Sequence, residues 1–151
     1  MKSCCFFGHK NCTKEVKNTL LSTLERLILE QGVYTFYIGT QGGFDKLVYE
    51  VLCELEKKYE IQVVVVLAYL NQIIDEVYYA AEKTIFPDEL TTVPPRFAIR
   101  RRNAFMIKRS DFVVAYLDTP FTNAFVNVEE AVRKKKHVIN LGNYDVKKFL
   151  P

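Results

Sequence analysis

Short runs of consecutive apolar residues alternate along the chain with longer segments in which apolar residues recur every three or four positions. The runs are typical of strands buried on both faces, and the longer segments are typical of amphipathic helices. Strands are predicted at residues 3–7, 33–38, 61–67, 112–117 and 137–141. Helices are predicted at residues 14–31, 47–55, 73–78, 97–109 and 126–136. This alternation predicts an α/β fold in which about five parallel strands form a doubly wound sheet with flanking helices.

Local sequence signals place some of the boundaries of these elements. Thr13 is a suitable N-cap for the first helix, and Gly32 is a suitable stop. Segment 84–95 contains three prolines and follows neither pattern, so we expect a loop there that moves or lies over a ligand site. No repeat, low-complexity stretch or flexible linker divides the chain, which predicts one domain over residues 1–151.

The composition is that of an ordinary globular domain. Hydrophobic residues make up 49% and charged residues 26% of the 151 residues, and the formal net charge is +3. A charge this small does not favour nucleic acid as a partner. The longest apolar run, residues 63–70, is too short to span a membrane, and no signal peptide precedes the first strand. We therefore expect a cytoplasmic protein without a membrane partner.

The cysteines and the histidine near the N-terminus do not form a standard metal motif. Cys4, Cys5, His9 and Cys12 fall within nine residues, a spacing that matches no zinc pattern. Cys4 and Cys5 are neighbours on a predicted strand, so their side chains should point to opposite faces and not pair. We predict reduced thiols and no metal site.

Ligands of doubly wound sheets bind outside the carboxyl ends of the strands. This rule selects three loops, at residues 8–12, 39–44 and 118–123. In the first loop, Gly8 lets the backbone turn tightly, and His9 and Lys10 follow as candidate phosphate or ribose contacts. The alternative for this loop is a tight strand-to-helix turn with an exposed histidine.

The second loop places Gly39, Gly42 and Gly43 ahead of Asp45. Free backbone N–H groups at a glycine-rich helix start suit an anion. The spacing is neither that of a Walker loop nor that of a dinucleotide fingerprint. Asp45 is either an acceptor for a sugar hydroxyl or a cap of the following helix.

Two polar segments add further candidates. Arg100, Arg101 and Arg102 precede Asn103, and because helical residues fan out by about 100°, one arginine can face the sheet edge and pair with phosphate. The alternative is a solvated charge run. Thr122 and Asn123 are suited to donate to phosphate, or one of them caps the next helix.

Taken together, these segments resemble the SLOG superfamily and, within it, the YpsA-like branch. The stretches that carry the resemblance are CCFFGHK, GTQGGFD, RRNAFMIKRSDFVVAY and KKKHVINL, which cover nearly the whole chain in order. The resemblance implies a Rossmann-like sheet that binds a nucleotide-type ligand (a nucleoside phosphate, ADP-ribose or NAD) in a sensor or regulatory role. The implied ligand-binding residues are Gly8, His9, Lys10, Gly39, Gly42, Gly43, Asp45, Arg102, Asn103, Thr122 and Asn123. The resemblance also implies a homodimer, and no cofactor other than a bound nucleotide.

A more distant resemblance to the LOG phosphoribohydrolases implies catalysis. That branch removes the base from a nucleoside 5'-monophosphate with an arginine and a glutamate, which fall here on Arg102 and Glu129. The chain departs from the branch where Thr122 and Asn123 replace a Gly-Gly pair and Phe125 replaces a later glycine. Three hypotheses result: nucleotide binding, hydrolysis that releases a free base, and a non-catalytic interaction module with a decayed site.

Overall fold

The computed structural model describes residues 1–9, 12–40, 42–70 and 79–149. Within these ranges, six parallel strands form one sheet in the order β4-β3-β2-β1-β5-β6. The strands are β1 (Lys2–Gly8), β2 (Val33–Ile38), β3 (Gln62–Val66), β4 (Thr84–Ile85), β5 (Phe112–Tyr116) and β6 (His137–Asn140). The α-helices are α1 (Val16–Gln31), α2 (Gly42–Glu56), α3 (Ala98–Arg109) and α4 (Asn123–Arg133). Short 3-10 helices are η1 (Ala81–Lys83), η2 (Asp88–Leu90), η3 (Pro95–Phe97) and η4 (Val146–Phe149).

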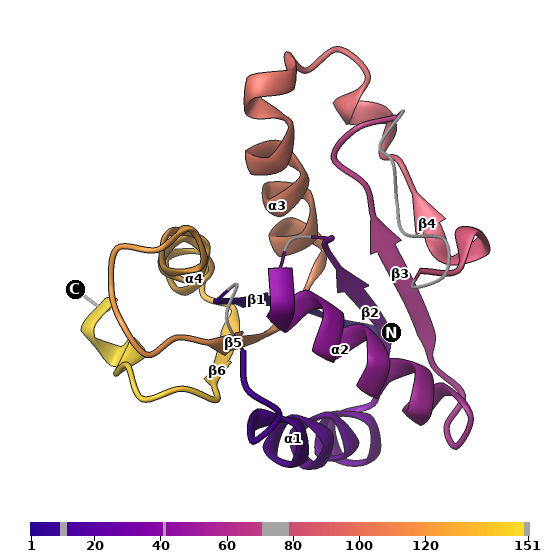
Figure 1. The fold of residues 1–151 in the computed structure, drawn as a ribbon, viewed down its shortest axis with the longest axis vertical. Coiled ribbons are helices and arrows are strands. Elements are labelled where there is room, and N and C mark those ends of the chain that lie inside the picture. The colour runs from indigo at the N-terminus through magenta and orange to yellow at the C-terminus, as the bar shows by residue number, and fades with distance from the viewer. Residues whose placement is uncertain (10–11, 41, 71–78, 150–151) are drawn as a thin grey trace.

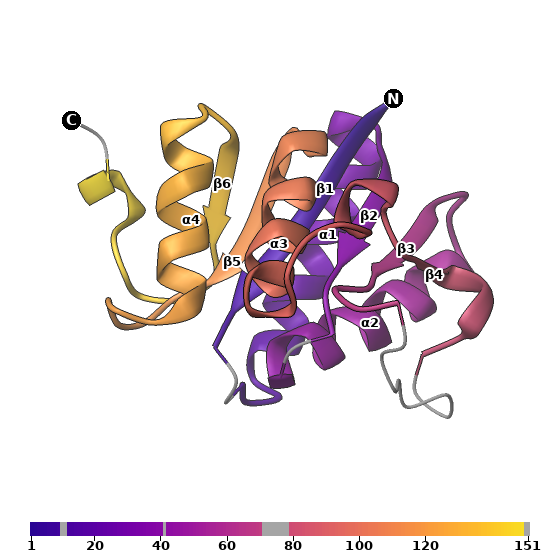
Figure 2. The same ribbon diagram turned by 90° about the horizontal axis from the view of Figure 1, so that it is seen from above.

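Helices cover both faces of the sheet, which confirms the predicted doubly wound, Rossmann-like α/β fold. Helices α1 and α2 pack on one face, and α3 and α4 pack on the other (Figures 1 and 2). The strands are apolar on both sides because both sides are buried. Cys4 belongs to the core under α1 and α2, and Cys5 belongs to the core under α3 and α4, as the alternation along β1 predicts.

The strand order creates a switch point beside β1. The chain adds β2, β3 and β4 outward on one side of β1, and then crosses back to place β5 on the other side. The connections that leave β1 and β5 therefore diverge at the carboxyl ends of these strands. Such a crevice is where ligands of doubly wound sheets bind.

The irregular segment 84–95 is not the free loop that its prolines predicted. Its first two residues form β4, which pairs in parallel with β3, and the N–H of Leu67 donates to the carbonyl of Ile85 at 2.8 Å. Leu90 in η2 is only 4% exposed. A two-residue strand carries no periodicity, so the pattern of apolar residues could not reveal this sixth strand.

Two helix ends also test the predicted boundaries. Gly32 ends α1 as predicted: its φ is +69°, and its N–H donates to the carbonyl of Leu27. The predicted cap at Thr13 was wrong, because α1 begins at Val16 and Thr13 contributes its carbonyl to the N–H of that residue. The helix predicted at residues 73–78 lies outside the described residues.

Candidate functional site

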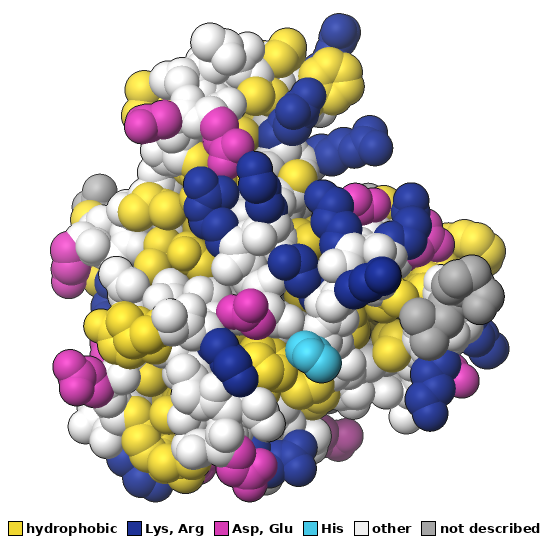
Figure 3. Space-filling model, turned by 180° about the vertical axis from the view of Figure 1, so that it is seen from behind, with side chains coloured by type: hydrophobic (Ala, Val, Ile, Leu, Met, Phe, Trp, Pro, Cys, Tyr) yellow, Lys and Arg dark blue, Asp and Glu magenta, His cyan; other side chains and the backbone are white. Residues whose placement is uncertain are grey.

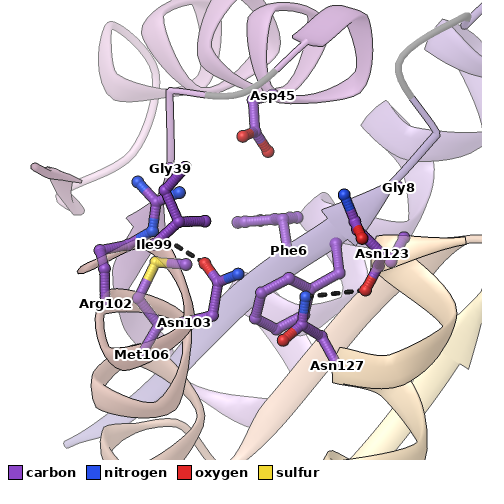
Figure 4. Close-up of a pocket in the computed structure, with 12 residues that line it drawn as sticks. Phe6, Gly8, Gly39, Asp45, Ile99, Arg102, Asn103, Met106, Asn123 and Asn127 are labelled. Carbon is purple, nitrogen blue, oxygen red and sulfur yellow. Dashed lines mark hydrogen bonds between the residues drawn. The ribbon is translucent and has the colours of Figure 1, made fainter. Parts of the chain in front are cut away.

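A pocket of about 200 Å³ opens at the carboxyl end of β1, between α2, α3 and α4 (Figure 4). It is lined by Phe6, Phe7, Gly8, Gly39, Asp45, Ile99, Arg102, Asn103, Met106, Asn123, Ala124 and Asn127. The pocket therefore occupies the crevice at the switch point, where strand order predicts a ligand site.

The side chain of Arg102, on α3, points into the protein interior, and Arg102 is 1% exposed. Its Nε donates to Oδ1 of Asn103 at 2.8 Å, and its Nη1 donates to the carbonyl of Val66 at 3.0 Å. A Cβ at Gly39 would lie 3.0 Å from the guanidinium carbon, so the guanidinium packs closely on that backbone. Burial lowers the pKa of Arg102, and the charge of Asp45 opposes this shift. Arg102 thus links α3 to the ends of β2 and β3.

Asp45 supplies the negative charge of the pocket. It lies in the first turn of α2, where the helix dipole favours a carboxylate, and it is 7% exposed. Figure 4 shows its carboxylate directed toward the pocket. Among the described lining residues there is no histidine, cysteine or hydroxyl side chain, so Asp45 is the one acid or base there besides Arg102.

Three asparagine amides face the pocket from two helices (Figure 4). Asn103 comes from α3, and Asn123 and Asn127 come from α4. Asn123 and Asn127 are one helical turn apart, and Nδ2 of Asn127 donates to the carbonyl of Asn123 at 3.0 Å. Each amide offers donors and an acceptor, so the three asparagines can form hydrogen bonds with both donors and acceptors of a ligand.

Two glycines of the predicted site, Gly8 and Gly42, are at positions where a side chain would clash or the backbone φ is positive. A Cβ at Gly8 would lie 2.4 Å from the ring of Phe44, so Gly8 lets α2 pack on the end of β1. Gly42 has a φ of +83° at the start of α2. Gly8 and Gly39 line the pocket, whereas Gly42 and Gly43 lie at the adjacent helix start.

His9 is directed at a neighbouring loop. Its Nε2 accepts a hydrogen bond from the N–H of Asp118 at 2.8 Å, and its ring lies edge-on to Tyr116. His9 therefore ties the loop after β1 to the loop after β5, and Lys10 lies outside the described residues.

The structure does not bring Glu129 to Arg102. Glu129 forms an ion pair with Arg133 one turn along α4, at 2.7 Å, and it does not line the pocket. Thr122 caps α4, because its hydroxyl accepts from the N–H of Phe125 at 3.2 Å. The capping role is therefore the one observed for Thr122, while Asn123 lines the pocket.

Comparison with known proteins identifies the family. Residues 2–147 match the family model YpsA, described as the YspA SLOG family. The chain belongs to this SLOG family. None of the curated proteins matches the chain in sequence.

The SLOG chain is also similar in fold to a solved structure of DNA processing protein A from Helicobacter pylori. The TM-score is 0.65 at 14% sequence identity, and the match covers 98% of this chain and 78% of that chain. That protein is described as binding single-stranded DNA. Its ligand contradicts our expectation that nucleic acid is not a partner, which rested on the small net charge of the whole chain. A sum over 151 residues hides how cations are distributed on the surface.

Sequence reasoning missed half of the residues that line the pocket of this SLOG chain. Those are Phe6, Phe7, Ile99, Met106, Ala124 and Asn127. Helical spacing could have found some of them, because Met106 is one turn after Arg102 and Asn127 is one turn after Asn123. Phe6 and Phe7 carry only the pattern of a buried strand.

Cys4 and Cys5 are buried in the two cores of the SLOG chain, whereas Cys12 and Cys53 are partly exposed. Burial raises the pKa of the Cys4 thiol, and it raises the pKa of Cys5 to about 12. Among the described residues, no three His, Cys, Asp or Glu side chains are arranged to hold a metal ion. None of the described helices is long and apolar enough to cross a membrane.

Proposed function

We propose that this SLOG chain binds a nucleotide or a nucleotide-derived ligand in the pocket at the end of β1. The observation that supports this is the convergence of three asparagine amides and Asp45 on a pocket lined by Phe6. Amide groups pair with the edges of nucleobases, and a carboxylate accepts hydrogen bonds from ribose hydroxyls. Ile99, the exposed large apolar side chain of the described lining, offers a surface for a flat base.

The size of the pocket supports partial enclosure of the ligand. Small-molecule sites usually measure about 300–1,000 Å³, whereas this pocket measures about 200 Å³. A nucleoside unit would enter, and phosphates or a second nucleotide would extend outside. The start of α2 at Gly42 and Gly43 lies beside the pocket and suits such phosphates, because helix N-termini favour anions.

The position of Glu129 favours binding over hydrolysis. Its carboxylate is held by Arg133 away from the pocket lining. Catalysis by Arg102 and Glu129 stays a prediction. Incubation of the protein with AMP, with detection of free adenine, tests it directly.

Calorimetry and thermal unfolding against nucleoside monophosphates, NAD and ADP-ribose test the binding proposal. A ligand at 100 times its Kd stabilises the folded state by about 2.7 kcal/mol, which raises Tm by about 5–11 °C in a domain of this size. Asn127→Ala should weaken binding roughly tenfold, or about 1.4 kcal/mol. Asn18→Ala, an exposed asparagine of α1, is the matched control and should bind as the wild type does. Absence of binding by the folded protein across the panel would overturn the proposal.

A second candidate function is binding of single-stranded DNA, and the similarity to DNA processing protein A favours it. A strand could place one of its nucleotides in the same pocket, because partial enclosure leaves room for the neighbouring ones. In that case AMP should displace a labelled oligonucleotide, and Asn127→Ala should weaken both ligands. An oligonucleotide that binds without competition from AMP would exclude a shared site.

A further inference from the structure

A second hollow lies on the outer side of α3, away from the pocket at the strand ends. It measures about 120 Å³ and is lined by Glu89, Leu90, Arg101, Ala104, Phe105, Lys108 and Lys134. We call it the basic groove. In Figure 3, Lys and Arg side chains gather in the upper half of the view, over α3 and the adjacent end of α4.

The cations of the basic groove are aligned by helix geometry. Arg101 and Lys108 are seven residues apart, which is two turns of α3 and about 10 Å along its axis. They therefore share one side of the helix, and Lys134, just after α4, lines the same groove. Ile99 and Asn103 project from another side of α3 into the pocket at the strand ends. The groove and the pocket are thus separate sites on one helix.

The fold does not explain why Arg101 is a cation. It is the fourth residue of α3, near a helix start that contains no acidic residue, and the helix dipole disfavours positive charge there. Among the described residues, ion pairs engage Arg109 with Glu89 and Lys134 with Glu130, but none engages Arg101 or Lys108. Both side chains are exposed to solvent, so an anion from outside the chain can reach them.

The floor of the groove is apolar. Leu90 is buried, and the guanidinium of Arg109 lies 3.7 Å from the centre of the Phe105 ring. At the C-terminal end of α3, the ammonium of Lys136 donates to the carbonyl of Lys108 at 3.5 Å. The site therefore combines aligned charges with an apolar base, which suits a ligand that carries repeated phosphates beside apolar groups.

We propose that the basic groove binds the phosphodiester backbone of a single-stranded nucleic acid. A strand offers phosphates in a row that can follow Arg101, Lys108 and Lys134, and its sugars can lie over Leu90 and Ala104. The hollow measures only about 120 Å³, so a strand would lie along it and not be enclosed by it. This site does not depend on nucleotide binding in the pocket at the end of β1.

Fluorescence anisotropy with a labelled oligothymidylate of about 12 nucleotides tests the groove. Three neutralised phosphates give a slope of about −2 for log K against log salt, so a rise from about 50 to about 200 mM should weaken binding roughly 18-fold. The triple variant Arg101→Ala, Lys108→Ala, Lys134→Ala should lose most of the affinity and nearly all of this salt dependence. The matched control Lys17→Ala, Lys57→Ala, Lys58→Ala removes the same charge from α1 and from the turn after α2. The control should keep both the affinity and the salt dependence.

Three results would overturn the proposal. The folded wild type does not bind the oligonucleotide, the control variant loses as much affinity as the groove variant, or a poly-glutamate peptide displaces the strand at equal charge. The last result would assign the groove to an acidic protein. Binding of AMP by the groove variant should be unchanged, so failure of the pocket proposal and failure of the groove proposal are told apart in the same protein samples.

Discussion

Replacement of Arg102 by methionine separates two roles that a buried arginine beside a ligand pocket can have. Methionine keeps much of the volume but removes the charge and all donors. If Arg102 mainly holds the fold, the variant loses stability. If the guanidinium is kept for a ligand, the variant loses binding and little stability. Its contacts favour the first role, because its Nε and Nη1 both bind groups of the protein.

The magnitude follows from those contacts. Hydrogen bonds to a charged group contribute about 1.5–3 kcal/mol each, and Arg102 makes two, to Val66 and Asn103. The buried carboxylate of Asp45 also loses its nearby positive charge. Removal of the buried cation relieves its own desolvation cost, which offsets part of the loss. We expect a net destabilisation of about 3 kcal/mol, which lowers Tm by about 6–12 °C in a domain of this size.

Urea unfolding followed by circular dichroism measures this loss, with Arg102→Lys as the comparison. Lysine keeps the charge but cannot reach both acceptors with a planar fork, so its stability should fall between those of the wild type and Arg102→Met. A methionine variant within about 0.5 kcal/mol of the wild type would refute the structural role. If that variant had also lost nucleotide binding, the guanidinium would be a ligand group.

Three further predictions concern the core and the surface. Gly8→Ala puts a Cβ 2.4 Å from a phenylalanine ring of α2, so it should cost about 1–3 kcal/mol, and an unchanged Tm would contradict this packing. After alkylation of the native protein, mass spectrometry should find Cys12 labelled. Cys5, whose pKa is about 12, should be labelled only after unfolding. Equal labelling rates for Cys5 and Cys12 in the native protein would show that the core opens. Hydrogen bonds from the hydroxyl of Tyr59 and, to a smaller extent, from the ammonium of Lys58 lower the pKa of Glu25. Ionised Glu25 therefore stabilises the fold above its ordinary pKa, and this contribution disappears as pH falls through the lowered pKa. Urea unfolding of Tyr59→Phe should therefore show a stability deficit at neutral pH that narrows below about pH 4, and a deficit independent of pH would refute the linkage.

The strands and helices that the sequence predicts best are those with a long pattern or a long apolar run. Helix α3 begins one residue from its predicted start at residue 97, and β3 lies within the predicted strand 61–67. The short strand β4 has two residues, too few for a period, and its position depends on pairing with β3. Pairing across the sheet is a tertiary property that local sequence does not encode.

The candidate site was harder to predict, because a pocket combines side chains that are distant in sequence. Gly8, Asp45 and Arg102 are in the lining. The sequence made Gly8 a candidate because it follows a strand, Asp45 because it follows a glycine-rich turn, and Arg102 because one arginine of a helical run can face the sheet edge. Asn127 was missed because it lies in the second turn of α4, beyond the loop at residues 118–123. His9 was placed in the ligand site because it follows a strand end, but its hydrogen bond to the N–H of Asp118 depends on the neighbouring loop.

The run Arg100-Arg101-Arg102 shows how one charged segment can serve several purposes. Consecutive helical residues differ by about 100° in direction, so the three side chains cannot share an environment. Arg102 is buried against Gly39 and Val66, Arg101 lines the basic groove, and Arg100 is exposed. Arg102 holds α3 on the sheet, and the position of α3 fixes the direction in which Arg101 points. If this coupling is correct, Arg102→Met should disturb the groove and weaken oligonucleotide binding, whereas Arg101→Ala should weaken that binding without lowering Tm.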